Sequence, residues 1–167
     1  MKKFYILETQ RLLREVTWGH CLIGLREVIN EIGSLDVDYW LLQDIWQSGA
    51  YDFNLGNAYA ELTKNEPKGL CVSPEDFQIN CNSVVQVIDG TLIAINSKTE
   101  EEPLLVLDAF DSSTWHLATS DELIGERLIK CGWEKSLYFP RLRGFPDWVN
   151  KFKENDDVVK SGVEFID

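Results

Sequence analysis

Two runs of β-branched and apolar residues flank Asp89-Gly90 at the centre of this 167-residue chain. The stretch reads SVVQVIDGTLIAIN, with the runs at 83–88 and 91–96. Such runs favour strands, and a two-residue Asp-Gly link is the preferred type I′ turn of a β-hairpin because both residues tolerate positive φ. The sequence therefore predicts an antiparallel hairpin in the middle of the fold.

Two further strands are expected to continue this hairpin as a meander. Residues 104–110 (LLVLDAF) are apolar at their start, which is typical of a central strand. A fourth strand is expected over 114–118. Near the N-terminus, 4–7 (FYIL) reads as a short strand and 8–16 as one or two helical turns. The prediction is an antiparallel sheet of about four strands.

Amphipathic helices are expected to pack on this sheet. Apolar residues recur every three or four positions in CLIGLREVINEIG, which Gly33 ends, and again over 38–47 (DYWLLQDIWQ). These two segments predict a helical hairpin. The clearest helix, at 120–131, is expected to start from a capping box made by Thr119 and Glu122.

Shorter helices are expected from SPEDF and over DWVNKFKEN. Helices, then strands, then a further helix describe an α+β fold. A length of 167 residues without repeats or linkers indicates one domain over 1–167. The tail after about residue 150 is expected to be loosely attached.

The strongest feature of the composition is a net charge of −12. Between Glu31 and Glu122 there are 17 acidic residues and three lysines. Such a field repels nucleic acid and anionic membranes and attracts basic partners. An acidic surface also serves solubility alone. No apolar run approaches the roughly 20 residues of a membrane span, and charges after FYIL interrupt any signal peptide, so a cytoplasmic protein is expected.

The four cysteines argue against a metal site. Cys21, Cys71, Cys81 and Cys131 form no C-x-x-C pair, and the only local pair of potential ligands is His20 beside Cys21. Zinc sites usually show tightly spaced ligand pairs. Reduced thiols, no bound metal and no cofactor are therefore expected.

The stretch DAFDSSTWHLATSDE is the best place to look for chemistry, because it holds His116, one of only two histidines. A hydrolase would need a nucleophile in reach of that histidine and a third group to orient it. The nearby serines read as turn formers, and no G-x-S-x-G motif occurs. A hydrolase using His116 with Asp108 or Asp111 remains an alternative to a binding role.

A binding role rests on acids and aromatic rings, since the chain has six tryptophans and five tyrosines. Trp115 lies at the end of an element, where an exposed ring could anchor an interface, although it could equally join the core. The candidate partner-binding residues are Asp36, Asp38, Asp52, Asp108, Asp111, Trp115 and His116.

The order of these elements resembles small acidic immunity proteins of bacterial contact-dependent and polymorphic toxin systems. The resemblance spans residues 70–133, from SPEDF through VVQVIDGTLIAI to PLLVLDAFDSSTWHLATSDELIGERLIKCGW, and rests on element order and charge. It implies a non-enzymatic cytoplasmic inhibitor that binds a cognate basic toxin domain, often a nuclease. A generic protein-interaction module is the other alternative.

Overall fold

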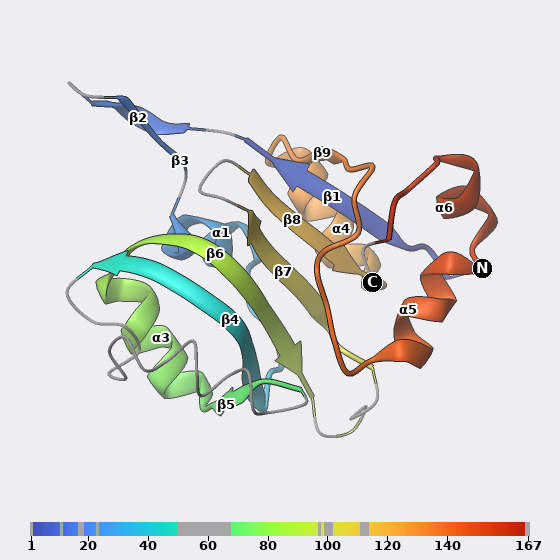
Figure 1. The fold of residues 1–167 in the computed structure, drawn as a ribbon, viewed down its shortest axis with the longest axis horizontal. Coiled ribbons are helices and arrows are strands. Elements are labelled where there is room, and N and C mark those ends of the chain that lie inside the picture. The colour runs from blue at the N-terminus through green and yellow to red at the C-terminus, as the bar shows by residue number, and fades with distance from the viewer. Residues whose placement is uncertain are drawn as a thin grey trace.

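The computed structural model describes most of the chain and shows an α+β fold (Figure 1). The described residues are 2–10, 12–16, 19–22, 24–49, 68–96, 98, 102–110 and 114–165. Within them, seven strands form one antiparallel sheet in the order β5-β4-β6-β7-β8-β1-β9, and β2 pairs with β3 separately. The α+β prediction is confirmed, but the sheet is larger than the expected four or so strands.

The strands of the sheet are, in spatial order, β5 (Leu70–Val72), β4 (Tyr39–Gly49), β6 (Val84–Ile95), β7 (Leu105–Phe110), β8 (Thr114–Thr119), β1 (Tyr5–Thr9) and β9 (Glu134–Lys135). The predicted strands at 4–7, 104–110 and 114–118 are confirmed as β1, β7 and β8. β6, β7 and β8 form an antiparallel meander, but it has three strands here where four were expected, because 83–88 and 91–96 belong to one strand. The helical turns expected over 8–16 are wrong. That segment contains the strand β2 (Leu12–Val16), which pairs with β3 (Gly19–Leu22).

The predicted helix over 38–47 is wrong, because this segment forms β4. Successive side chains of β4 point to opposite faces of the sheet, and both faces are covered, so Trp40 and Leu41 are both buried. A strand buried on both sides shows no alternation of polar and apolar residues. A bulge then adds one residue and places Ile45, rather than Asp44, on the buried side. The apolar residues of β4 therefore recur at intervals that resemble those of an amphipathic helix.

The predicted hairpin turn at Asp89-Gly90 is also wrong, since β6 continues through it. The halves on either side of the dipeptide pair with the same strand, β4, rather than with each other. Opposite Gly90, β4 carries two residues, Asp44 and Ile45, and Asp44 has a φ of 52°. Gly90 itself has a φ of 136°, so the unusual backbone geometry that glycine tolerates is used opposite a β-bulge.

The helices agree better with expectation. They are α1 (Leu25–Ile32), α3 (Pro74–Ser83), α4 (Glu122–Lys130), α5 (Pro146–Lys153) and α6 (Asp156–Lys160). Four of them, α1, α3, α4 and α5, confirm predicted helices. The cap of α4 differs from the predicted capping box. Asp121 accepts hydrogen bonds from the backbone N–H groups of Leu123 and Ile124, whereas the Thr119 hydroxyl donates to the Leu104 carbonyl.

The two faces of the sheet are covered by different parts of the chain. On one face, α1, α3 and α4 bury a core that includes Leu7, Trp40, Leu107 and Trp115. On the other face lies the chain after β9, which crosses the sheet to α5 and α6 (Figure 1). Trp148, Phe152 and Val158 of these two helices are buried in a second core.

Candidate functional site

A row of polar side chains crosses the face of the sheet that the C-terminal segment covers. Each member lies directly opposite the next on the neighbouring strand. From β4 to β9 the row consists of Gln43, Thr91, Asp108, His116, Glu8 and Glu134. The parallel row two residues along is apolar and made of Leu41, Ile93, Val106, Ala118 and Ile6. The polar row therefore marks the border of the second core.

Asp108 is the centre of the row, and only 2% of the residue is exposed. Arg141, from the C-terminal segment, binds its carboxylate through Nε at 3.0 Å and Nη2 at 2.9 Å. The same guanidinium binds Asp89 at 2.6 Å and donates to the carbonyl of Ala109 at 2.8 Å. Thr91 donates to the Asp108 carboxylate at 3.2 Å. The cluster ties the crossing segment to strands β6 and β7.

These groups perturb one another electrostatically. Burial would lower the pKa of Arg141, but its hydrogen bonds to Asp89 and Asp108 outweigh burial and raise that pKa. Burial raises the pKa of the Asp108 carboxyl, and the hydrogen bonds from Arg141 and Thr91 act against that rise. A guanidinium stays charged in proteins, so Arg141 always offers Asp108 a cation. The arrangement suits a structural ion pair.

His116 lies beside this cluster and is 7% exposed. Its Nδ1 is 3.2 Å from the hydroxyl of Ser136, and its ring packs edge-on against Tyr138 and Phe110. Burial, and then the charge of Arg141, lower the pKa of His116 from its ordinary value of 6.5. The imidazole is therefore neutral near pH 7.

The pair of His116 and Ser136 resembles part of a catalytic triad, but its bonding differs. The Ser136 hydroxyl also donates to the Tyr138 carbonyl and accepts from the Tyr138 N–H, and Ser136 is 3% exposed. The Asp108 carboxylate is engaged by Arg141 and Thr91. A triad needs the acid on the histidine and the nucleophile open to substrate. These contacts instead fasten the segment after β9 to the sheet.

The protonation of His116 should appear in the stability of the fold. Because the folded protein lowers the pKa of His116 below 6.5, the unfolded chain takes up a proton more readily as the pH falls. We expect the free energy of unfolding to decrease as the pH drops below about 6.5, by at most about 1.4 kcal/mol per pH unit for one proton. Urea unfolding between pH 5 and 7.5 measures this.

The matched control is His116→Gln, which keeps a polar group at the position and removes its titration. The difference in unfolding free energy between the two proteins should shrink as the pH falls. Glu8, whose pKa burial raises from 4.5, is present in both and cancels in the comparison. Parallel pH curves for the two proteins would contradict a depressed pKa at His116.

The residues singled out from the sequence separate into two groups. Asp108, Trp115 and His116 are buried, whereas Asp36 and Asp38 are exposed on the loop before β4. The other two candidates, Asp52 and Asp111, lie outside the described residues. Sequence reasoning missed Arg141 and Ser136. Neither lies in a local motif, and each acts on a strand at least 20 residues away in the chain.

Exposed acids gather at one end of the sheet. Asp38 donates its backbone N–H to the carbonyl of Ile95, and Trp40 pairs with Val72, so the start of β4 adjoins the end of β5. Helix α3 begins two residues after β5, with acids in its first turn. We name this the acidic corner, and it consists of Asp36, Asp38, Glu75 and Asp76, all exposed.

No family model, curated protein or solved structure matches this chain. Within the described residues, no helix is both long and apolar enough to span a membrane. The same part of the chain contains no cluster of three or more histidine, cysteine or acidic side chains that could hold a metal ion.

Proposed function

We propose that this chain is a non-enzymatic immunity protein that binds a cognate toxin domain of basic charge, such as a nuclease, and blocks it. The acidic corner carries this proposal. Its four carboxylates come from one loop and one helix start that adjoin in space. In the described part of 31–122 the bases are Lys68 and Lys98. Such a surface complements a lysine- and arginine-rich substrate cleft.

The proposed mechanism is electrostatic capture followed by occlusion. A nuclease holds its substrate's phosphates with clustered lysine and arginine side chains. Carboxylates of the acidic corner would approach the same side chains, so bound inhibitor and nucleic acid would compete. Charge complementarity mainly accelerates encounter, and it can reach about 10⁸–10⁹ M⁻¹s⁻¹ at low salt. Speed is useful to an inhibitor that must bind a toxin before the toxin acts.

The contacts of the buried members of the polar row favour binding over the hydrolase alternative. His116 and Ser136 are almost inaccessible, and the Asp108 carboxylate is bonded to Arg141. A hydrolase needs its base within reach of a substrate proton. We therefore place the proposed function on the exposed Asp36 and Asp38, and not on the buried candidates.

The first test is co-expression with the protein encoded immediately upstream, because immunity genes follow their toxin genes. We expect the chain to restore growth to cells that produce that toxin's C-terminal domain and to co-purify with it in equimolar amounts. Purified toxin domain should lose its activity on addition of one equivalent of the chain. Unchanged toxicity and no complex would contradict the proposal.

The second test asks whether the acidic corner drives association. Neutralising its four acids to Asn or Gln should lower the association rate with the toxin about tenfold at low salt, and added salt should slow the wild type more than the variant. Stopped-flow fluorescence measures both rates. The dissociation rate should change less, since exposed charges act mainly on encounter.

A variant of equal charge is the control. It neutralises the exposed acids Asp147, Glu154, Asp156 and Glu164. Like the corner set, it removes four negative charges. Each set also includes two acids that lie in the first turn of a helix, which are Glu75 and Asp76 in the corner set and Asp147 and Asp156 in the control. Equal slowing by both sets would mean that total charge alone matters and that the acidic corner is not the binding surface.

A further inference from the structure

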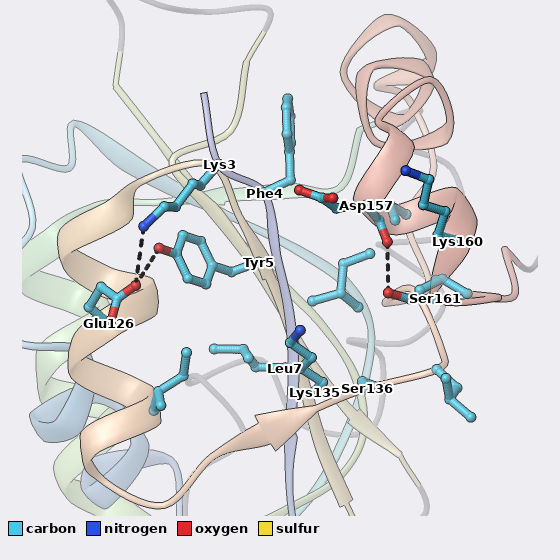
Figure 2. A pocket seen from close by; sticks show the side chains of 15 residues that line it. Lys3, Phe4, Tyr5, Leu7, Glu126, Lys135, Ser136, Asp157, Lys160 and Ser161 are labelled. Carbon is cyan, nitrogen blue, oxygen red and sulfur yellow. Dashed lines mark hydrogen bonds and ion pairs between the residues drawn. The ribbon is translucent and has the colours of Figure 1, made fainter. Parts of the chain in front are cut away.

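A cleft of about 710 Å³ opens at the opposite edge of the sheet, beside β1 (Figure 2). Helix α4 forms one wall, the start of α6 and the residues after it form the other, and β9 closes one end. A volume of this size lies within the range of ligand-binding pockets, about 300–1,000 Å³. The cleft is distinct from the polar row and from the acidic corner.

The floor of the cleft is an incompletely paired strand edge. β9 covers β1 only at Leu7 and Glu8, and the last backbone contact beyond them is the Ser136 N–H donating to the Ile6 carbonyl. Residues of one strand direct their backbone groups alternately to either side. Phe4 therefore faces the cleft together with Ile6. Within the described residues, the Phe4 N–H and C=O and the Ile6 N–H have no backbone partner.

The walls lie where side chains of an added strand would point. An extended segment beside β1 would direct alternate side chains to the α4 side and to the α6 side. The α6 side is apolar, with Val158, Val163 and the 55% exposed Leu137. On the α4 side, Tyr5 donates to Glu126 at 2.8 Å and Ile129 is 42% exposed.

The charges of the cleft differ from those of the rest of the molecule. Lys3 pairs with Glu126 of the α4 wall and with Glu122, and Asp157 lies in the first turn of α6, where the helix dipole favours a carboxylate. Lys135 and Lys160 also line the cleft, and in the described chain neither forms a salt bridge. The lining therefore carries three lysines against two acids, a net charge of +1 in a molecule whose net charge is −12.

We propose that this cleft binds an extended, acidic segment of a partner protein by strand addition to β1. The Phe4 and Ile6 backbone groups would supply the ladder of hydrogen bonds. Apolar side chains of the segment would lie against Val158 and Val163 on the α6 side. Its carboxylates, which point to the other side, would meet Lys135, whose position on β9 is directly opposite Leu7 of the core beneath α4. Strand addition of this kind gains affinity from the main chain and specificity from alternate side chains.

The walls explain why a single segment is favoured over a second copy of this chain. α4 and α6 stand on either side of the open edge, so a strand that belongs to a folded sheet would bring its own covering layers against them (Figure 2). Lysines at strand edges can also serve only to prevent aggregation. The experiment must separate this role from binding.

The probe is a capped eight-residue peptide of alternating valine and glutamate, added to the full chain labelled with ¹⁵N. We expect saturable binding with a dissociation constant below about 1 mM. The largest shifts should fall on the amides of Phe4 and Ile6. The same peptide N-methylated at alternate residues cannot donate to β1, and a valine–lysine peptide reverses the charge. Both should bind at least about tenfold more weakly.

Lys135→Glu should weaken binding of the valine–glutamate peptide about tenfold. Lys160→Glu, on the α6 side that receives the valines, should weaken it less, and Lys98→Glu, an exposed lysine away from the cleft, should leave it unchanged. Three outcomes would overturn the proposal. They are no binding of the peptide at a concentration of about 1 mM, equal binding of the N-methylated peptide, or self-association of this chain that the Lys135→Glu substitution abolishes. The test needs no toxin, so it is independent of the proposed immunity function.

Discussion

Replacing Arg141 with methionine is expected to lower the free energy of unfolding by about 3 kcal/mol, because it leaves a buried carboxylate without its counter-ion. Asp108 is 2% exposed, and Arg141 supplies its side-chain cation and also binds Asp89 and the carbonyl of Ala109. Breaking one partner of a buried pair typically costs about 3–5 kcal/mol. The lower figure applies because the Arg141 side chain is 32% exposed. Urea unfolding at pH 7 measures the loss.

Arg143→Met is the matched control. Arg143 lies two residues away and pairs with Asp44 at 3.0 Å, but the Asp44 side chain is 55% exposed. Exposed ion pairs contribute about 0–1 kcal/mol. Adding Asp108→Asn to Arg141→Met should restore at least half of the loss, because the buried charge is then gone. Equal costs for the two arginine variants would contradict the structural role given to the Asp108–Arg141 pair.

The two arginines illustrate what sequence patterns cannot provide. Both belong to PRLRGF, a turn-rich stretch without periodicity, yet Arg141 contacts side chains 33 and 52 residues earlier in the chain. Asp36 and Asp108 are equally polar in sequence, but one is exposed and the other is buried. Burial depends on which segment crosses the sheet, and that information is not local.

The elements that were predicted correctly each have a residue pattern that fits only one type of secondary structure. Helices α1 and α4 each bury one side and expose the other, so their apolar residues repeat with the helical period. Strand β7 is a short, mostly apolar run, and β8 (TWHLAT) is a short segment rich in β-branched and aromatic residues; both types of residue favour strands. β4 has neither property. It is covered on both faces and bulged at Asp44, so its pattern fits a helix equally well.

The C-terminal segment links the fold to the two proposed binding surfaces. It covers the second face of the sheet and is held there by Arg141 and by the contact of His116 with Ser136. The acidic corner lies at the β5 edge and the cleft at the β1 edge, with the strands between them. Substitutions at one surface should leave the other intact, so the two proposals can be tested separately in one protein.

Gly90→Ala is expected to lower the free energy of unfolding by about 3 kcal/mol or more, through two effects at one residue. Gly90 has a φ of 136°, a region costing an L-residue about 1–3 kcal/mol. A Cβ there would lie 2.7 Å from the Cα of Ile45 and 3.1 Å from the carbonyl oxygen of Asp44, and overpacking adds about 1–3 kcal/mol. Backbone atoms of a central strand cannot move aside without the loss of hydrogen bonds to the neighbouring strands.

Gly162→Ala separates these two effects. Gly162 also has positive φ, 70°, but a Cβ there would meet nothing within 4 Å, so only the backbone strain of about 1 kcal/mol applies. We expect thermal and urea unfolding to rank Gly90→Ala well below Gly162→Ala in stability. Because Gly90 lies opposite the bulge that turns Asp44 outward, its variant should also loosen the amide protection of Leu42 and Leu92. Equal stability of the two variants would contradict the close approach of Asp44 and Ile45 to Gly90 at the bulge of β4.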